Sequence, residues 1–131
     1  GRLLLCLVFL IAAVGHKIPN FSAVARTMTS EGVPAAPVML CLSILFLVAG
    51  SLLVVLGYHA RVGAGLLAAF LALAAYFFHD FWNLEDAAAH EQMMHFLKNL
   101  GLIGAMLFLM ANGSGAGSLD GRQPAGSSLP V

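Results

Sequence analysis

The chain has 131 residues, a formal net charge of zero, 60% hydrophobic residues and only 9% charged residues, a composition that excludes an ordinary soluble domain. No run is rich in Lys or Arg, which argues against a nucleic-acid partner. The uncharged stretches 32–58, 62–78 and 99–119 approach the roughly 20 apolar residues that carry a helix across a bilayer. We therefore expect one small integral membrane domain that has lipid as its solvent.

The first predicted helix covers about Leu3 to Ile18. Its uncharged part ends at Gly15, so it reaches spanning length only if His16 and Lys17 lie at the far interface, with the Lys17 stem extending toward water. A signal peptide fits less well, because no cleavage site leads into a soluble sequence and further spanning runs follow. This segment is therefore expected to be a first transmembrane helix.

The segment 20–31 has a different pattern. Apolar Phe21, Val24 and Met28 recur at spacings of three and four residues, and polar Arg26 lies largely opposite them. This pattern favours a short amphipathic helix at the membrane surface between the first two spanning helices. An ordinary polar loop is the alternative.

Three more spanning helices are predicted after this segment. The second of them is rich in Gly and Ala, which allow helices to approach closely in a membrane, and it ends in an aromatic belt. A polar loop over 79–91 is expected between the last two. The three predicted helices cover about 34–56, 62–78 and 90–110.

The predicted fold is therefore all-α, an integral membrane four-helix bundle over residues 1–111. Residues 112–131 are rich in Gly, Ser and Pro and are expected to form a flexible C-terminal tail. Four spans place both termini on one side of the membrane.

The sidedness follows from the positive charges. Arg2, Arg61 and Arg122 lie on the side of the termini, whereas Lys17 and Arg26 lie on the other. Because positive charge is enriched on the inner side, this excess favours cytoplasmic termini.

Ionisable residues gather at one end of the predicted bundle. On the last helix Glu91, His95 and Asn99 follow one another at four-residue spacing, and Lys98 lies three residues after His95, so they share about one face. Charged groups inside a membrane boundary usually face the bundle interior and are paired. The plain alternative for each is a capping or snorkelling role at a helix end. The candidate polar pocket consists of His16, Lys17, His79, Asp80, Glu91, His95, Lys98 and Asn99.

No metal site is expected. His90 and His95 flank a pattern like the zincin HExxH motif, but their spacing is five rather than four, so they do not share a helical face. A histidine pair from two helices, such as His79 with His95, could ligate a tetrapyrrole, but no feature of the sequence fixes such a pair. Cys6 and Cys41 form no CxxC pair and are expected to be separate structural thiols.

Several of these motifs resemble the DoxX family. They are Gly15-His16-Lys17-Ile18, Gly57-Tyr58-His59-Ala60-Arg61, His79-Asp80-Phe81-Trp82 and Phe96-Leu97-Lys98-Asn99-Leu100-Gly101. The resemblance covers about residues 2–110 and implies a four-helix protein of the bacterial inner (cytoplasmic) membrane. Some members of the family look like quinone-linked subunits of redox complexes, but the resemblance transfers no catalytic role to any residue here.

The leading functional interpretation is an auxiliary, non-catalytic subunit of a larger membrane redox or energy-transducing complex. Its partners would be membrane lipids and other integral membrane subunits. One alternative is a quinone-reactive oxidoreductase subunit that uses Asp80, His95 and Lys98. The other is a binder or carrier of a small hydrophobic molecule. No motif fixes a cofactor, and quinone, lipid and tetrapyrrole all stay open.

Overall fold

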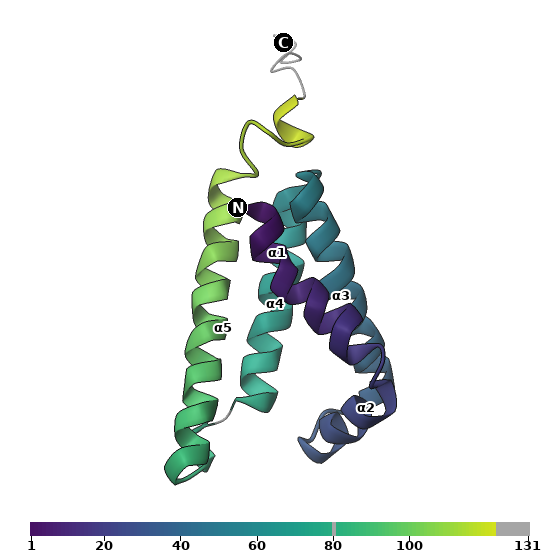
Figure 1. Ribbon diagram of the computed structural model, residues 1–131, viewed down its shortest axis with the longest axis vertical. Coiled ribbons are helices and arrows are strands. Elements are labelled where there is room, and N and C mark those ends of the chain that lie inside the picture. The colour runs from purple at the N-terminus through teal and green to yellow at the C-terminus, as the bar shows by residue number, and fades with distance from the viewer. Residues whose placement is uncertain (80, 123–131) are drawn as a thin grey trace, which may run out of the picture.

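The computed structural model describes residues 1–79 and 81–122, and the regular structure of this part of the chain is helical (Figure 1). This confirms the predicted all-α membrane bundle. The long helices are α1 (Arg2–Leu10), α2 (Phe21–Ser30), α3 (Ala36–Leu56), α4 (Ala60–Phe78) and α5 (Asp86–Asn112). A π-helical segment, Ile11–Lys17, continues α1, and short 3₁₀ turns cover Phe81–Asn83 and Asp120–Arg122.

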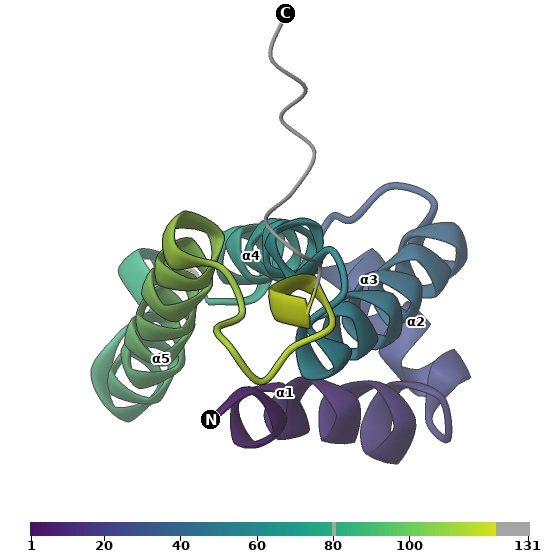
Figure 2. The same ribbon diagram turned by 90° about the horizontal axis from the view of Figure 1, so that it is seen from above.

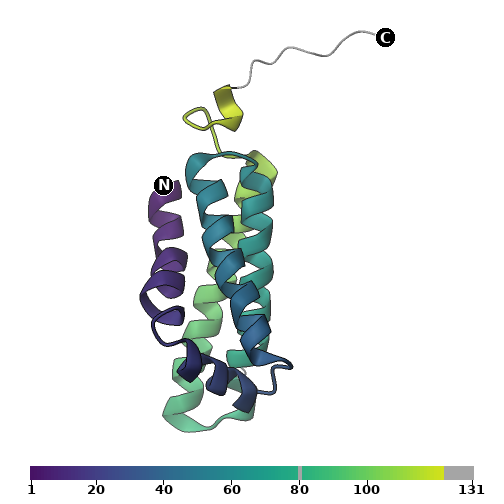
Figure 3. The same ribbon diagram turned by 90° about the vertical axis from the view of Figure 1, so that its right-hand side faces the viewer.

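In the part of the chain that the structure describes, three helices are long and apolar enough to cross a membrane: α3, α4 and α5. The pair Arg2–Lys17 and Phe21–Ser30 passes the same criterion together, although it is bent by 100°. If that pair makes one broken span, the described residues contain four spans, the number that the sequence predicts. The bend turns α2 across one end of the bundle (Figure 3).

The helices pack in the order α1, α3, α4 and α5 (Figure 2). The main core contains Cys6 and Phe9 from α1, Leu47 from α3, Leu67 from α4 and Met106 from α5. A second, smaller core lies under α2. It is made by Ala25, Met28, Val33, Ala36 and Leu40.

Two glycines set the spacing between α3 and α4. A Cβ atom at Gly63 would lie 2.7 Å from the carbonyl oxygen of Gly50 and 2.8 Å from the Cβ of Leu53. A Cβ at Gly50 would lie 2.9 Å from the Cγ of Leu67. The backbones therefore approach as closely as small residues allow, as the sequence predicts for the glycine- and alanine-rich helix.

The amphipathic segment is helical, which confirms that prediction for α2. Its apolar face is covered, with Met28 buried, and its polar residues face outward. The helix ends before Gly32, whose φ of 81° is unfavourable for residues with a Cβ.

The predicted polar loop is shorter than expected, because α5 begins at Asp86 rather than near His90. The negative charge of Asp86 in the first turn interacts favourably with the partial positive charge of the helix N-terminus. The three alanines that follow are strong helix formers. His90 and Glu91 therefore belong to the second turn of α5 rather than to a loop.

Residues 113–122 fold back over the turn between α3 and α4. The N–H groups of Leu119 and Asp120 donate to the carbonyls of Leu56 and Gly57, at 3.3 and 2.7 Å. The Arg2 guanidinium donates to the carbonyl of Gly117 at 2.7 Å, so the beginning of α1 lies at the same end of the molecule (Figure 1). The remainder of the predicted tail, 123–131, lies outside the described residues.

Candidate ligand-binding site

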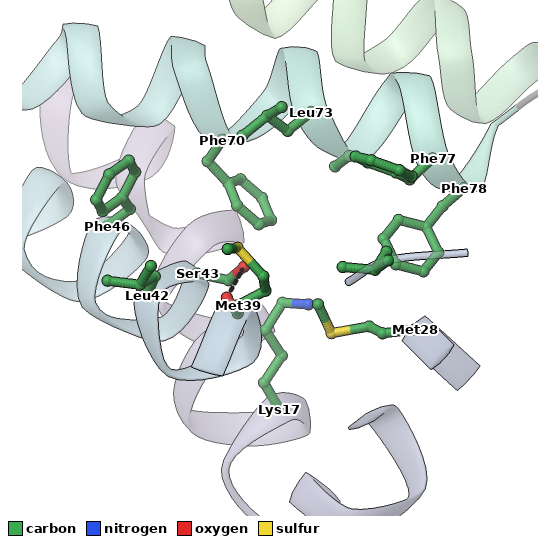
Figure 4. A pocket seen from close by; sticks show the side chains of 12 residues that line it. Lys17, Met28, Met39, Leu42, Ser43, Phe46, Phe70, Leu73, Phe77 and Phe78 are labelled. Carbon is green, nitrogen blue, oxygen red and sulfur yellow. Dashed lines mark hydrogen bonds between the residues drawn. The ribbon is translucent and has the colours of Figure 1, made fainter. Parts of the chain in front are cut away.

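Lys17 is the last residue of the π-helical segment. The N–H of Ile18 donates to the carbonyl of Ala13 at 3.0 Å, five residues back, so this turn holds one more residue than an α-helical turn. The Lys17 side chain is half-buried, and its Nζ lies 5.6 Å from the centroid of the Phe70 ring. Lys17 thus extends into the molecule instead of snorkelling outward (Figure 4).

An apolar cavity of about 170 Å³ lies beside the Lys17 ammonium. The Ser43 hydroxyl in its wall donates to the carbonyl of Met39 at 2.9 Å, so it is satisfied within α3. Lys17 is then the one charged side chain among the described residues of the wall. The cavity is lined by Lys17, Met28, Val33, Met39, Leu42, Ser43, Phe46, Phe70, Leu73, Ala74, Phe77 and Phe78 (Figure 4).

A second cavity of about 530 Å³ lies on the other side of Lys17 and is more polar. Lys17, Phe70, Ala74 and Phe78 line both cavities, so the two adjoin. The amide of Asn99, a residue that is 6% exposed, belongs to the second wall. The polar residues lining the second cavity are His16, Lys17, Asn20, Thr27, His79 and Asn99.

A histidine pair lies at the edge of the second cavity. The rings of His79 and His95 stack with centroids 5.3 Å apart and an angle of 15° between their planes. His79 Nδ1 lies 2.7 Å from Oε1 of Gln92, and His95 Nδ1 lies 3.2 Å from Nζ of Lys98. Glu91 completes this group, with its Oε1 4.0 Å from His95 Nε2. Rings stacked in this way lie face to face and do not converge on a common point.

The predicted pocket residues therefore fall into two groups. His16, Lys17, His79 and Asn99 line the second cavity. Glu91, His95 and Lys98 lie together along α5 outside both cavity walls. Among the described residues, the His79–His95 stack links them to the first group. Asp80 lies outside the described residues.

Sequence reasoning missed the apolar cavity. Its wall takes side chains from several segments of the chain, between Lys17 and Phe78, and the aromatic residues in it have the spacing of any apolar helix. One signal was available, because Gly15 ends an uncharged run too short to span and so places Lys17 deeper than a residue at a helix end. Gln92 was also missed as the partner of His79.

The fold and these cavities define a small polytopic helical membrane protein with an apolar cavity next to a polar one. The chain belongs to the DoxX family, whose sequence pattern matches residues 1–80. This confirms the resemblance seen in the motifs.

Two Escherichia coli proteins are similar to the chain over most of its length. Inner membrane protein YphA is 31% identical over 122 residues, which cover 93% of this chain and 86% of YphA. Inner membrane protein YqjF is 34% identical over 120 residues, which cover 92% of this chain and 86% of YqjF. No solved structure gives a significant match.

Proposed function

We propose that this protein binds a small hydrophobic molecule with a polar head group in the two cavities that adjoin at Lys17. The observation that carries the proposal is the single ammonium at the boundary between an apolar and a polar cavity. A ligand with an apolar body and one hydrogen-bond acceptor fits this division, because the acceptor meets Lys17 while the body displaces no ordered polar contact. A quinone head group is one member of this class.

The size of the apolar cavity limits the ligand body. An engineered protein cavity of about 150 Å³ holds one benzene molecule. The cavity here, at about 170 Å³, is comparable and takes a single six-membered ring. Phe46, Phe70, Phe77 and Phe78 contribute ring faces and edges that suit an aromatic guest (Figure 4).

We place this activity in the bacterial inner membrane. The support is the family membership together with the names of YphA and YqjF, both inner membrane proteins. The excess of arginine on the side of the termini favours cytoplasmic termini.

The test is thermal unfolding of the purified protein in mild detergent with three single-ring probes: a methyl-substituted 1,4-benzoquinone, benzamide and benzoate. A ligand present at 100 times its Kd stabilises the folded state by about 2.7 kcal/mol, so we expect at least one probe to raise the Tm by several degrees. Ala74→Leu fills the wall shared by the cavities and should abolish that rise.

Ala69→Leu is the matched control, because Ala69 lies on the exposed side of the same helix. It should leave the rise in Tm unchanged. The proposal fails if none of the probes stabilises the wild-type protein, or if Ala74→Leu responds as the wild type does.

A second function, an auxiliary subunit of a larger membrane redox or energy-transducing complex, is favoured by the outer face of α5. Of the most apolar stretch of α5, 11% is buried inside the molecule, against 28% for the corresponding stretch of α3. A Cβ atom at Gly101 or Gly104 would meet no atom within 4 Å, and Leu97 and Phe108 beside them are exposed. Small residues on such a face permit close approach of another helix.

Native mass analysis after gentle detergent extraction tests the subunit proposal. We expect co-purifying membrane subunits that are lost in the double variant Gly101→Leu, Gly104→Leu and kept in Ala69→Leu. A wild-type protein that is cleanly monomeric would count against it.

A further inference from the structure

We propose that the molecule bound at Lys17 is an anion, a single-ring aromatic weak acid whose carboxylate pairs with the Lys17 ammonium. This inference rests on the proposed function and names the class of ligand within it. The ring occupies the apolar cavity, and the carboxylate lies at the boundary with the polar one.

The charges around the cavities carry this inference. Lys17, His16 and His79 are the ionisable groups of the two walls, and no carboxylate belongs to either wall among the described residues. An ammonium removed from bulk water is costly unless a counter-charge or hydrogen-bond acceptors satisfy it. The Phe70 ring 5.6 Å away compensates for this loss only in part. A ligand carboxylate supplies the missing charge.

The described acidic residues near this end of the molecule lie elsewhere. Glu91 is 75% exposed and faces His95 on α5. Glu31 is exposed at the end of α2, and Glu85 and Asp86 are exposed at the start of α5. None of these four residues lines a cavity wall. Asp80 lies outside the described residues, so the experiment examines it directly.

The two cavities also fix the orientation of the ligand. On the apolar side, the carboxylate would lose its hydration among Leu73, Met28 and the phenylalanines without gaining a donor other than Lys17. On the polar side, the buried amide of Asn99 offers a further donor. The acid therefore binds with its carboxylate toward Asn99 and its ring away from it.

The experiment measures equilibrium binding of benzoate and benzamide to the full chain at pH 7, in the same detergent. The two probes have nearly the same shape and differ in charge. We expect wild-type protein to bind benzoate at least about tenfold more tightly, which corresponds to ~1.4 kcal/mol. Lys17→Met should remove the preference, and Lys98→Met, at an exposed lysine outside both walls, should keep it.

The wild-type comparison decides the inference even if Lys17→Met does not fold. Equal affinities for benzoate and benzamide would contradict the proposal of an anionic ligand and leave the proposed function standing. If neither benzoate nor benzamide binds, the proposal of an anionic ligand is also wrong. The proposed function fails too if, in addition, the benzoquinone does not stabilise the protein. Asp80→Asn should change benzoate affinity less than about threefold; a tenfold increase would mean that Lys17 already has a counter-ion, which contradicts the inference.

Discussion

Asp120 is the residue through which the C-terminal segment contacts α4. Its Oδ1 accepts from the N–H of His59 at 3.0 Å and its Oδ2 from the N–H of Ala60 at 3.1 Å. Those N–H groups open α4 and have no acceptor within the helix. An N-cap is thus supplied by a residue 60 positions away in the sequence.

The two hydrogen bonds make the Asp120 contact dependent on pH. The backbone N–H of Ala60, followed by that of His59, holds the pKa of the Asp120 carboxyl below its ordinary value of 3.8. A carboxyl with a lowered folded-state pKa stabilises the fold fully above its ordinary value, and this contribution is lost as pH falls through the folded pKa. The contact should therefore be complete at neutral pH and weaken only in strong acid.

We predict that Asp120→Asn increases deuterium uptake in residues 57–62 several-fold at pH 7, because the two N–H groups donate to two different carboxylate oxygens and the amide keeps only one of these oxygens. At a pH below the folded-state pKa of Asp120, the carboxyl is protonated and the difference between variant and wild type should shrink. Hydrogen exchange followed by mass spectrometry measures both effects. Glu31→Gln, which changes an exposed acid at the opposite end, should leave this peptide unaffected, and equal uptake in Asp120→Asn and wild type would refute the cap.

At the scale of single elements, the π-helical segment Ile11–Lys17 determines where Lys17 points. Each residue of a helix turns the chain by ~100°. Eight α-helical steps would turn Lys17 by about 80° away from Phe9, which packs into the main core, whereas the wider π turn absorbs one residue and brings Lys17 back toward the direction of Phe9. Such π segments occur often at functional sites.

We predict that insertion of one alanine after Val14 rotates Lys17 by ~100° out of the cavity walls. Val14 is 58% exposed, so an insertion beside it removes no core contact. The variant should still enter the membrane but lose the stabilisation by single-ring probes, as measured by Tm. Deletion of Val14 removes the one extra residue of the π turn, so it should keep Lys17 in register and preserve the stabilisation. An insertion variant that still responds would disconnect the segment from the site.

The contact between α3 and α4 gives a second prediction at this scale. Gly63→Ala should destabilise the protein by about 1–3 kcal/mol, because the added Cβ meets backbone and Cβ atoms that cannot rotate away. Gly65→Ala is the matched control on the same helix, since its nearest atom would be Cε of Met110 at 3.7 Å. Reversible unfolding in a detergent titration gives both free energies of unfolding. Equal stability of the two variants would contradict the tight contact.

At the scale of the whole molecule, the beginning of α1 and residues 117–122 lie at one end, and α2 lies at the other. We predict that reporter fusions at Gly1 and Val131 report the same compartment, the cytoplasm. A reporter inserted after Gly32 should report the opposite one. Opposite results for the two termini would mean that Arg2–Lys17 and Phe21–Ser30 do not make a complete span.

Most of the fold could be predicted because uncharged length is a direct signal in a membrane. The runs ending at Leu56 and Phe78 gave the ends of α3 and α4, and spacing alone gave α2. The start of α5 was misplaced because charged residues such as Glu91 indicate water but do not distinguish a loop from a helix that extends beyond the lipid. The docking of Asp120 onto His59 depends on a long-range contact that no local pattern carries.

The candidate site was less predictable than the fold. Spacing correctly placed Glu91, His95 and Lys98 along one side of α5, because that relation is local. Whether this group meets Lys17 depends on the packing of α5 against α4 and on the direction set by the π segment. The spacing of polar residues in the sequence predicts neither the helix packing nor the direction of Lys17. The residues predicted as one pocket therefore form two groups in the structure.

The two hydrogen bonds of Asp120 also affect the order in which the protein folds during synthesis. His59 leaves the ribosome 61 residues before Asp120 does, so α4 is inserted while its first two amides still lack their carboxylate partner. During that interval the C-terminal segment does not yet contribute to the hairpin of α3 and α4. The close contact between Gly50 and Gly63 must therefore form without help from the Asp120 hydrogen bonds. Closure of the α3–α4 turn therefore waits until Asp120 has been translated.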